Sequence, residues 1–248
     1  MDAHRDSRPD TGKLDARADR ASSGDRAGQI RTAPYGDAAT YWNRRAQDFG
    51  RIHPRLRQVR DLVEAAPRPV TTLLDIGCGP ATLRSVLPRA IDYFGVDIAE
   101  EVIRALDDPS HFEVVDLNET RICFDGKRFD AVVCSGIFEY IREPGPFLDF
   151  VRDTLAPSGY LILTFTNHQH YHDRLRWIGR TFTGYSDPHA NFLLIPEVVS
   201  LLRARGFVIL RHRSTTWHQR SHPLLARFLR FPLNVLNREY LFLCERIA

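Results

Sequence analysis

The feature that most constrains this 248-residue chain is a short apolar run that ends in two closely spaced glycines. The run is Thr71–Ile76, and Gly77 and Gly79 follow it at once. A second apolar run, Tyr93–Ile98, carries Asp97 near its end. A strand, a glycine turn, a helix start and a second strand ending in an acid are typical of the ligand-binding edge of a doubly wound sheet. The sequence therefore predicts an α/β fold with a ligand site at this edge.

Composition narrows the class of protein. A hydrophobic content of 43% supports a substantial core, and the length suits one domain of ordinary size. A net charge of +3 gives no case for nucleic acid as a partner. The apolar runs are strand-sized, so we expect no transmembrane segment, and the first residues lack the apolar stretch of a signal peptide. Four scattered cysteines favour a reduced, cytoplasmic protein. Arginine far outnumbers lysine, which we interpret as genome bias, as in a GC-rich bacterium.

The chain divides into a tail and one domain. Residues 1–33 contain no aromatic residue and alternate charged with small residues, which predicts a disordered tail. Residues 34–248 form the predicted domain, and 37–66 read as a helical cap with a break at His53–Pro54. Strands then alternate with helices, which favours parallel strands joined by helical crossovers. The expected strands lie near 71–77, 92–98, 111–116, 129–135 and 159–166, and the expected helices near 80–88, 99–107 and 145–155.

After residue 166 the alternation stops. Residues 167–195 and 217–238 read as irregular inserts. Between them we expect a helix at 196–205, ended by Gly206 as its cap, and a strand at 207–214. The last expected strand, 240–247, follows a connection that is not a simple helix. That connection predicts a final strand inserted antiparallel to the others.

Four blocks, Leu73–Ala81, Gly95–Ile98, Val115–Asn118 and Phe129–Ile141, follow one another in a familiar order and spacing. In this the chain resembles the class I S-adenosylmethionine (SAM)-dependent methyltransferases over about residues 37–248. The resemblance implies a Rossmann-like sheet of seven strands, mostly parallel with an antiparallel last strand, behind an N-terminal helical cap. It also implies SAM as the cofactor.

The resemblance assigns roles to individual residues. The two glycines let the backbone approach the methionine and ribose portions of SAM. Asp97 is expected to accept both ribose hydroxyls, and Asp116 the adenine amino group. Asp75 is expected near the ammonium group of the cofactor. The full implied cofactor-binding set is Asp75, Gly77, Gly79, Asp97, Ile98, Asp116, Leu117 and Ser135, with Ile98 and Leu117 flanking the adenine.

A dinucleotide is the alternative cofactor. An acid about 20 residues after the glycines also occurs in sites for nicotinamide cofactors, so Asp97 does not separate the two. However, Thr82 stands where the dinucleotide fingerprint needs a third Gly or Ala. This favours SAM. Asp97 and Asp116 also have a purely structural alternative, in which each caps the segment that follows it.

Residues for the chemical step are expected after the fourth and fifth strands, where this architecture places the methyl acceptor. The candidates are Tyr140, His168 and His170. Many small-molecule methyltransferases carry an acid followed by His after strand four, whereas this chain has Glu139 followed by Tyr140. The run of alternate histidines at 168–172 lacks a nearby cluster of acids or cysteines, so we predict no metal.

The leading hypothesis is O-methylation of a small molecule of secondary metabolism, with N- and C-methylation left open. Residues 164–180 and 191–206 also resemble a MetW-like branch that is linked to control of partner enzymes. A second hypothesis is therefore a SAM-binding partner protein without turnover. A third is an enzyme that uses SAM without methylating, for example by cyclising it. The apolar insert with spaced arginines at 221–237 is interpreted as a lid or core-packing helix, or as a site for an acidic carrier protein or a membrane surface.

Overall fold

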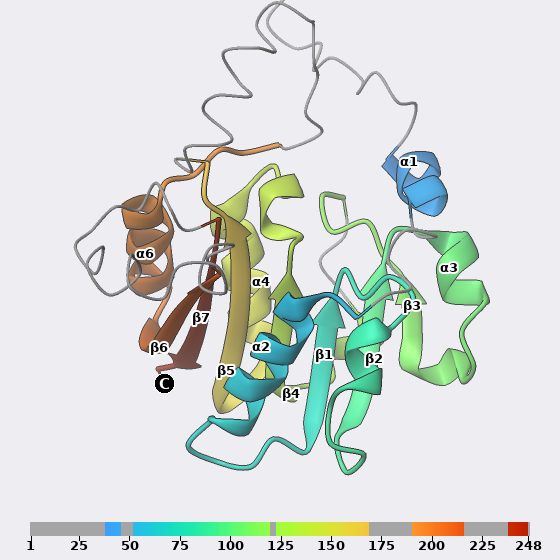
Figure 1. Ribbon diagram of the computed structural model, residues 1–248, viewed down its shortest axis with the longest axis horizontal. Helices are drawn as coiled ribbons and strands as arrows, with labels where there is room; N and C mark the ends of the chain where they lie inside the picture. The colour runs from blue at the N-terminus through green and yellow to red at the C-terminus, as the bar shows by residue number, and fades with distance from the viewer. Residues whose placement is uncertain (1–37, 46–51, 120–122, 169–189, 216–237, 248) are drawn as a thin grey trace, which may run out of the picture. The chain divides into compact units, whose positions relative to one another are not determined.

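A computed structural model describes residues 38–45, 52–119, 123–168, 190–215 and 238–247 (Figure 1). The predicted tail and most of the two predicted inserts, including His170, lie outside the described residues. All elements discussed below belong to one compact unit that begins at Ala33.

One sheet of seven strands organises this unit, in the order β3-β2-β1-β4-β5-β7-β6. The pairs among β1 to β5 are parallel, whereas β7 is antiparallel to both of its neighbours, β5 and β6. The predicted fold class, including the antiparallel last strand, is confirmed. The strands are β1 (Thr72–Ile76), β2 (Asp92–Asp97), β3 (Phe112–Val114), β4 (Phe129–Ser135), β5 (Leu155–Thr166), β6 (Phe207–Thr215) and β7 (Glu239–Arg246).

Helices cover both faces of this sheet, and β-strand alternation decides which residues meet them. One core cluster joins the helix α2 to the face that carries Leu73, Val133 and Ile162. The other joins α4 and α6 to the opposite face, which carries Leu74 and Leu163. The helices are α1 (Ala38–Arg45), α2 (Pro54–Glu64), α3 (Glu100–Arg104), α4 (Pro144–Thr154) and α6 (Ile195–Ala204).

The helix starts agree with the sequence at several points. The predicted break in the N-terminal cap is confirmed, because α2 begins at Pro54 with His53 as its N-cap. The His53 Nδ1 accepts a hydrogen bond from the Arg55 amide at 3.2 Å. At the other end of the chain, Gly206 has a positive φ of 76° directly after the last turn of α6, as a terminating glycine should.

Two local predictions are wrong. The expected helix at 80–88 is only a short 3-10 helix, η2 (Thr82–Ser85), because Ala81 adopts a left-handed conformation (φ 52°) that prevents a helix from starting at Pro80. The turn expected at 157–159 does not precede β5 but lies inside it. Ser158 has a φ of 60°, and the β4–β5 register shifts between Phe129 and Ala131, so these residues form an irregularity in the strand.

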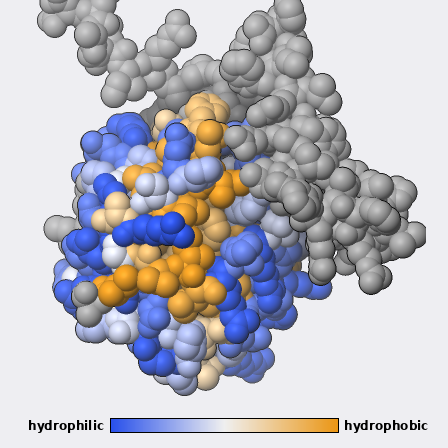
Figure 2. Space-filling view, turned by 90° about the vertical axis from the view of Figure 1, so that its left-hand side faces the viewer, coloured by the Kyte–Doolittle hydropathy of each residue, from blue (hydrophilic) through white to orange (hydrophobic). Residues whose placement is uncertain are grey.

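The strand β6 forms one edge of the sheet, and its exposed residues change from apolar to basic along the strand. Val208 near its start is exposed, whereas Arg211, His212 and Arg213 follow as an exposed basic run. The pairing of β6 with β7 shifts register between Ile209 and Arg211. Basic side chains and an irregularity both oppose strand addition at an open edge. Figure 2 faces the left-hand side of Figure 1, where β6 lies, and shows apolar residues gathered on that side of the molecule.

We predict that Leu148→Ala lowers the free energy of unfolding by about 2–5 kcal/mol, because Leu148 on α4 is fully buried in the core and its truncation leaves a cavity. The matched control is Leu194→Ala, since Leu194 is 38% exposed, and its cost is expected to stay below about 1 kcal/mol. Urea denaturation followed by circular dichroism measures both. Equal losses in the two variants would contradict the assignment of α4 to the core.

Candidate functional site

The glycine loop follows β1 at the carboxyl edge of the parallel strands. Gly77 and Gly79 have φ values of 73° and 50°, a region that side chains rarely adopt. The amides of Gly77 and Cys78 donate to the Val96 carbonyl at 2.8 and 3.1 Å, which ties the loop to β2. A side chain at Gly77 would also press on Ile137 at 3.0 Å, whereas the space beside Gly79 is open. The loop therefore keeps open space beside Gly79 in which a ligand can lie.

Asp97 ends β2 and closes this loop. Its Oδ2 accepts from the Gly79 amide and its Oδ1 from the Ala99 amide, both at 2.9 Å. Burial raises the pKa of Asp97, and the backbone hydrogen bonds from Ala99 and Gly79 oppose that rise. The predicted capping contact thus exists, but each carboxylate oxygen has a second lone pair for another donor. Asp97 and the next residue, Ile98, are both partly exposed.

The third-strand loop lies against the same acid. The Val115 amide donates to the Asp97 carbonyl at 3.0 Å. Asp116 is partly exposed, and its Oδ1 accepts from the Asn118 amide at 2.9 Å, while Leu117 is buried. The structure thus joins the residues predicted to surround the adenine and ribose. The Gly79 amide binds the Asp97 carboxylate, and the Val115 amide binds the Asp97 carbonyl.

Asp75 differs from the other acids, because it faces the interior. It is 4% exposed, and its Oδ2 accepts a hydrogen bond from the Tyr93 hydroxyl at 2.5 Å. Burial raises the pKa of Asp75 to about 7; the Tyr93 hydrogen bond opposes this rise, and nearby Asp97 adds to it. The sequence predicts a place for Asp75 near a ligand cation, but gives no sign of its tyrosine partner.

The segment after β4 is a 3-10 helix, η5 (Phe138–Tyr140), that borders the glycine loop through Ile137. The Tyr140 ring packs edge-on against the Trp42 ring of α1, with centroids 4.8 Å apart. The Asn118 amide group donates to the Tyr140 carbonyl at 3.2 Å. At the end of β4, the buried hydroxyl of Ser135 has no hydrogen-bond partner among the described residues. The segment therefore links the predicted cofactor side to the predicted acceptor side.

Glu139 joins η5 to β5 and to the segment before α6. Its Oε1 accepts from the Thr166 amide, and its carbonyl accepts from the Ala190 and Asn191 amides at 2.8 and 3.1 Å. The Asn191 side chain donates to the Phe138 and Ile141 carbonyls, each at 2.8 Å. Sequence reasoning gave Glu139 no role. The sequence signal for Glu139 was its place directly before Tyr140, where many small-molecule methyltransferases carry an acid followed by His.

The structure describes two of the three residues predicted to take part in the chemical step, Tyr140 and His168. His168 follows β5 two residues after Thr166, and its ring lies against the Phe192 ring with centroids 4.9 Å apart. Tyr140 lies on η5, so these two residues follow the adjacent strands β4 and β5 as expected. His170 is not among the described residues.

Arg55 at the start of α2 is the second residue that sequence reasoning missed. Its guanidinium pairs with Glu239 at 2.9 Å and lies so close to Gly136 that an added Cβ would meet it at 2.8 Å. Glycine, with a φ of 75° at position 136, leaves room for this cation beside the end of β4. The Pro54-Arg55 helix start was visible in the sequence, but the reach of the side chain was not.

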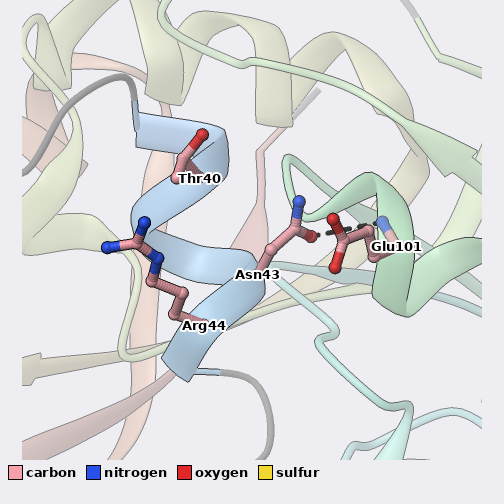
Figure 3. Close-up of a pocket in the computed structure, with 4 residues that line it drawn as sticks. All are labelled: Thr40, Asn43, Arg44 and Glu101. Atoms are coloured by element: carbon pink, nitrogen blue, oxygen red, sulfur yellow. Dashed lines mark hydrogen bonds between the residues drawn. The ribbon is translucent and has the colours of Figure 1, made fainter.

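A separate pocket of about 300 Å³ lies between α1 and α3 (Figure 3). Its lining residues are Thr40, Asn43, Arg44 and Glu101, and the Asn43 side chain accepts from the Glu101 amide at 3.2 Å. None of the predicted site residues lines it. Within the described part of the chain there is no group of three or more metal-binding side chains, and no helix there is long and apolar enough to span a membrane.

Comparison with known proteins shows the family of this chain. The sequence model of a methyltransferase domain family matches residues 41–212. A ubiquinone biosynthesis O-methyltransferase of Cereibacter sphaeroides is 27% identical over 158 residues, which are 59% of this chain and 64% of that relative. The chain thus matches less than two thirds of this relative's length.

Two solved structures share the fold. A SAM-dependent methyltransferase from Archaeoglobus fulgidus aligns with a TM-score of 0.57 at 16% identity, over 81% of this chain and 94% of that one. The [4+2]-cyclase SpnF aligns with a TM-score of 0.54 at 17% identity, over 77% of this chain and 81% of that one. Because the family match covers more than half of the chain and includes the glycine loop, Asp97 and the ends of β4 and β5, this chain belongs to the methyltransferase domain family, whose cofactor is S-adenosylmethionine.

Proposed function

We propose that this protein transfers a methyl group from SAM to an oxygen of a small molecule. The observation that carries the proposal is the Asp97 carboxylate, which two backbone amides hold at the rim of a glycine loop with open space beside it. The match to ubiquinone biosynthesis O-methyltransferases supports oxygen as the acceptor atom. Four buried free cysteines support a reducing, cytoplasmic setting.

The residues at the strand ends fit the chemistry of the cofactor. Each carboxylate oxygen of Asp97 accepts one backbone amide and keeps a second lone pair. These remaining lone pairs would accept the ribose hydroxyls. Ile98 and Leu117 would flank the adenine, and Asp116 would accept a hydrogen bond from its amino group. The methionine portion would pass Gly77, Gly79 and Ser135, and the buried Asp75 would offer an acid to its ammonium group.

The sulfonium of bound SAM supplies the activated methyl group. The task of the protein is then to hold the acceptor oxygen in line with that methyl group and to remove its proton. We assign the proton to a ring nitrogen of His168, which follows β5 and packs against the exposed ring of Phe192. Tyr140 on η5, whose ring packs against Trp42, is the second candidate.

We predict that Asp97→Ala weakens SAM binding by about 1.5–3 kcal/mol, because a charge-assisted contact to the ribose is lost. Asp92→Ala is the matched control, since Asp92 lies at the opposite end of the same strand and is exposed. Calorimetric titration of the folded variants gives both affinities. An unchanged affinity in Asp97→Ala means that the ribose lies elsewhere.

We also predict that His168→Asn lowers kcat by about 10²–10⁴-fold, the usual contribution of a general base, while the affinity for SAM is unchanged. The control is His212→Asn, which replaces an exposed histidine on β6. Single-turnover kinetics with an identified acceptor measure the effect. A kcat in His168→Asn equal to that of the control removes His168 from the mechanism.

The function itself is tested by incubating the protein with SAM and a panel of hydroxylated small molecules, followed by mass spectrometry. The expected result is S-adenosylhomocysteine (SAH) together with an acceptor that has gained one methyl group on oxygen. A methylated nitrogen or carbon would keep the methyltransferase but overturn the choice of oxygen.

A second function is favoured by one comparison, because SpnF shares this fold and is a [4+2]-cyclase. The fold alone therefore does not require methyl transfer. A [4+2] cycloaddition joins two parts of a substrate and would leave SAM intact. Release of methylthioadenosine from SAM identifies instead an enzyme that cyclises SAM itself. SAM binding without any turnover on the panel supports a SAM-binding partner protein without turnover.

A further inference from the structure

The Asp75–Tyr93 pair is the most unusual polar contact near the proposed cofactor site. Asp75 is 4% exposed and Tyr93 is 3% exposed, and their oxygens are 2.5 Å apart across the β1–β2 pair. A buried carboxylate is costly unless charges or hydrogen bonds compensate it. The Tyr93 hydroxyl supplies one hydrogen bond, which is a single neutral donor.

The charges around Asp75 do not neutralise it. Asp97 on β2 carries the same sign, and the buried thiols of Cys78 and Cys134 lie near it in the glycine loop and on β4. Arg55 on α2 is the cation that acts on Asp75, and its guanidinium is already paired with Glu239. Arg84 acts on Tyr93. In the described part of the chain, the free protein thus leaves this carboxyl in acidic surroundings.

The result is a carboxyl group that titrates near neutral pH. Burial raises the pKa of Asp75 to about 7, while burial keeps the pKa of Tyr93 well above its ordinary value. The tyrosine therefore remains a neutral donor near neutral pH, and Asp75 is the member of the pair that gains or loses a proton. A cation placed beside the carboxylate favours its charged form.

We propose that the Asp75–Tyr93 pair holds a proton in the free protein and releases it to solvent when the ammonium group of the cofactor binds. A proton and the cofactor cation thus compete for one buried carboxylate, which makes Asp75 a sensor for the amino-acid portion of the ligand. The inference rests on the proposed cofactor site, and its consequence is that ligand binding and pH are linked.

The direct test is titration of the full chain with SAH in two buffers of different ionisation enthalpy at the same pH. Because the pKa of Asp75 is about 7, binding at pH 7 is expected to release about half a proton. The affinity for SAH is expected to be about tenfold higher at pH 8 than at pH 6 for the same reason.

Two variants separate Asp75 from other groups. Asp75→Asn still accepts from Tyr93 but cannot titrate, so its SAH binding should release no proton from this site. Tyr93→Phe keeps the ring against Phe112 and removes the donor that lowers the pKa, so the pH dependence should move to higher pH. Asp153→Asn, an exposed change on α4, is the control and should behave as the wild type.

Methylthioadenosine, which lacks the amino-acid portion, identifies the cation. The proposal expects it to bind without proton release. Release equal to that with SAH would overturn the ammonium assignment, and undiminished release in Asp75→Asn would overturn the role of Asp75. Failure of the wild type to bind SAH at all contradicts the proposed function instead, so the two failures are distinguishable.

The same pair makes the stability of the free protein depend on pH. Asp75 has a pKa of about 7 when folded against 3.8 as its ordinary value, so the folded state binds more protons between these values. Its contribution to stability is therefore full below about pH 4 and is lost as the pH rises to about 7. We predict that the urea midpoint of Asp75→Asn rises relative to that of the wild type as the pH increases from 5 to 8. A constant difference between the two proteins would contradict the proton on Asp75.

Discussion

The hydrogen bonds of the Asp97 carboxylate are the interaction on which the rest of this site depends. One oxygen binds the Gly79 amide and the other binds the Ala99 amide, so a single side chain spans the glycine loop and the start of α3. The Asp97 carbonyl also binds the Val115 amide, which ties the third-strand loop to the same residue. A charge that is largely buried is tolerated here because backbone donors compensate it. The contact thus fixes three loops around one anion.

The acceptor side is organised by a different element, the segment 137–141 after β4. Its Ile137 borders Gly77, its Tyr140 packs on Trp42, and its Glu139 binds the end of β5. The Asn191 side chain holds the same segment from the far end of the predicted insert. Residues that are distant in sequence are therefore brought to one place. The segment 137–141 therefore contacts both the glycine loop and the end of β5.

The sequence was sufficient for the sheet but not for the contacts within it. Near-continuous apolar runs predict β1, β2 and β4 within one or two residues, since parallel strands buried on both faces leave such runs. The helix predicted after the glycine loop is wrong, because Ala81 takes a left-handed conformation that the sequence does not reveal. The positions of Asp97 and Asp116 at strand ends were predictable from spacing. The partner of Asp75 was not, because a cross-strand tyrosine depends on register and rotamer.

Arg55 and Glu139 illustrate the same limit. Both are charged residues near element starts, and many such residues are solvent-exposed, so their contacts with Gly136 and Thr166 emerge only from the fold. The central claim, that Asp97 holds the ribose of the cofactor, is tested most directly by a crystal structure of the protein with SAH. The account predicts both ribose hydroxyls within hydrogen-bond distance of the Asp97 carboxylate, with the adenine between Ile98 and Leu117. A ribose bound away from Asp97 would contradict it.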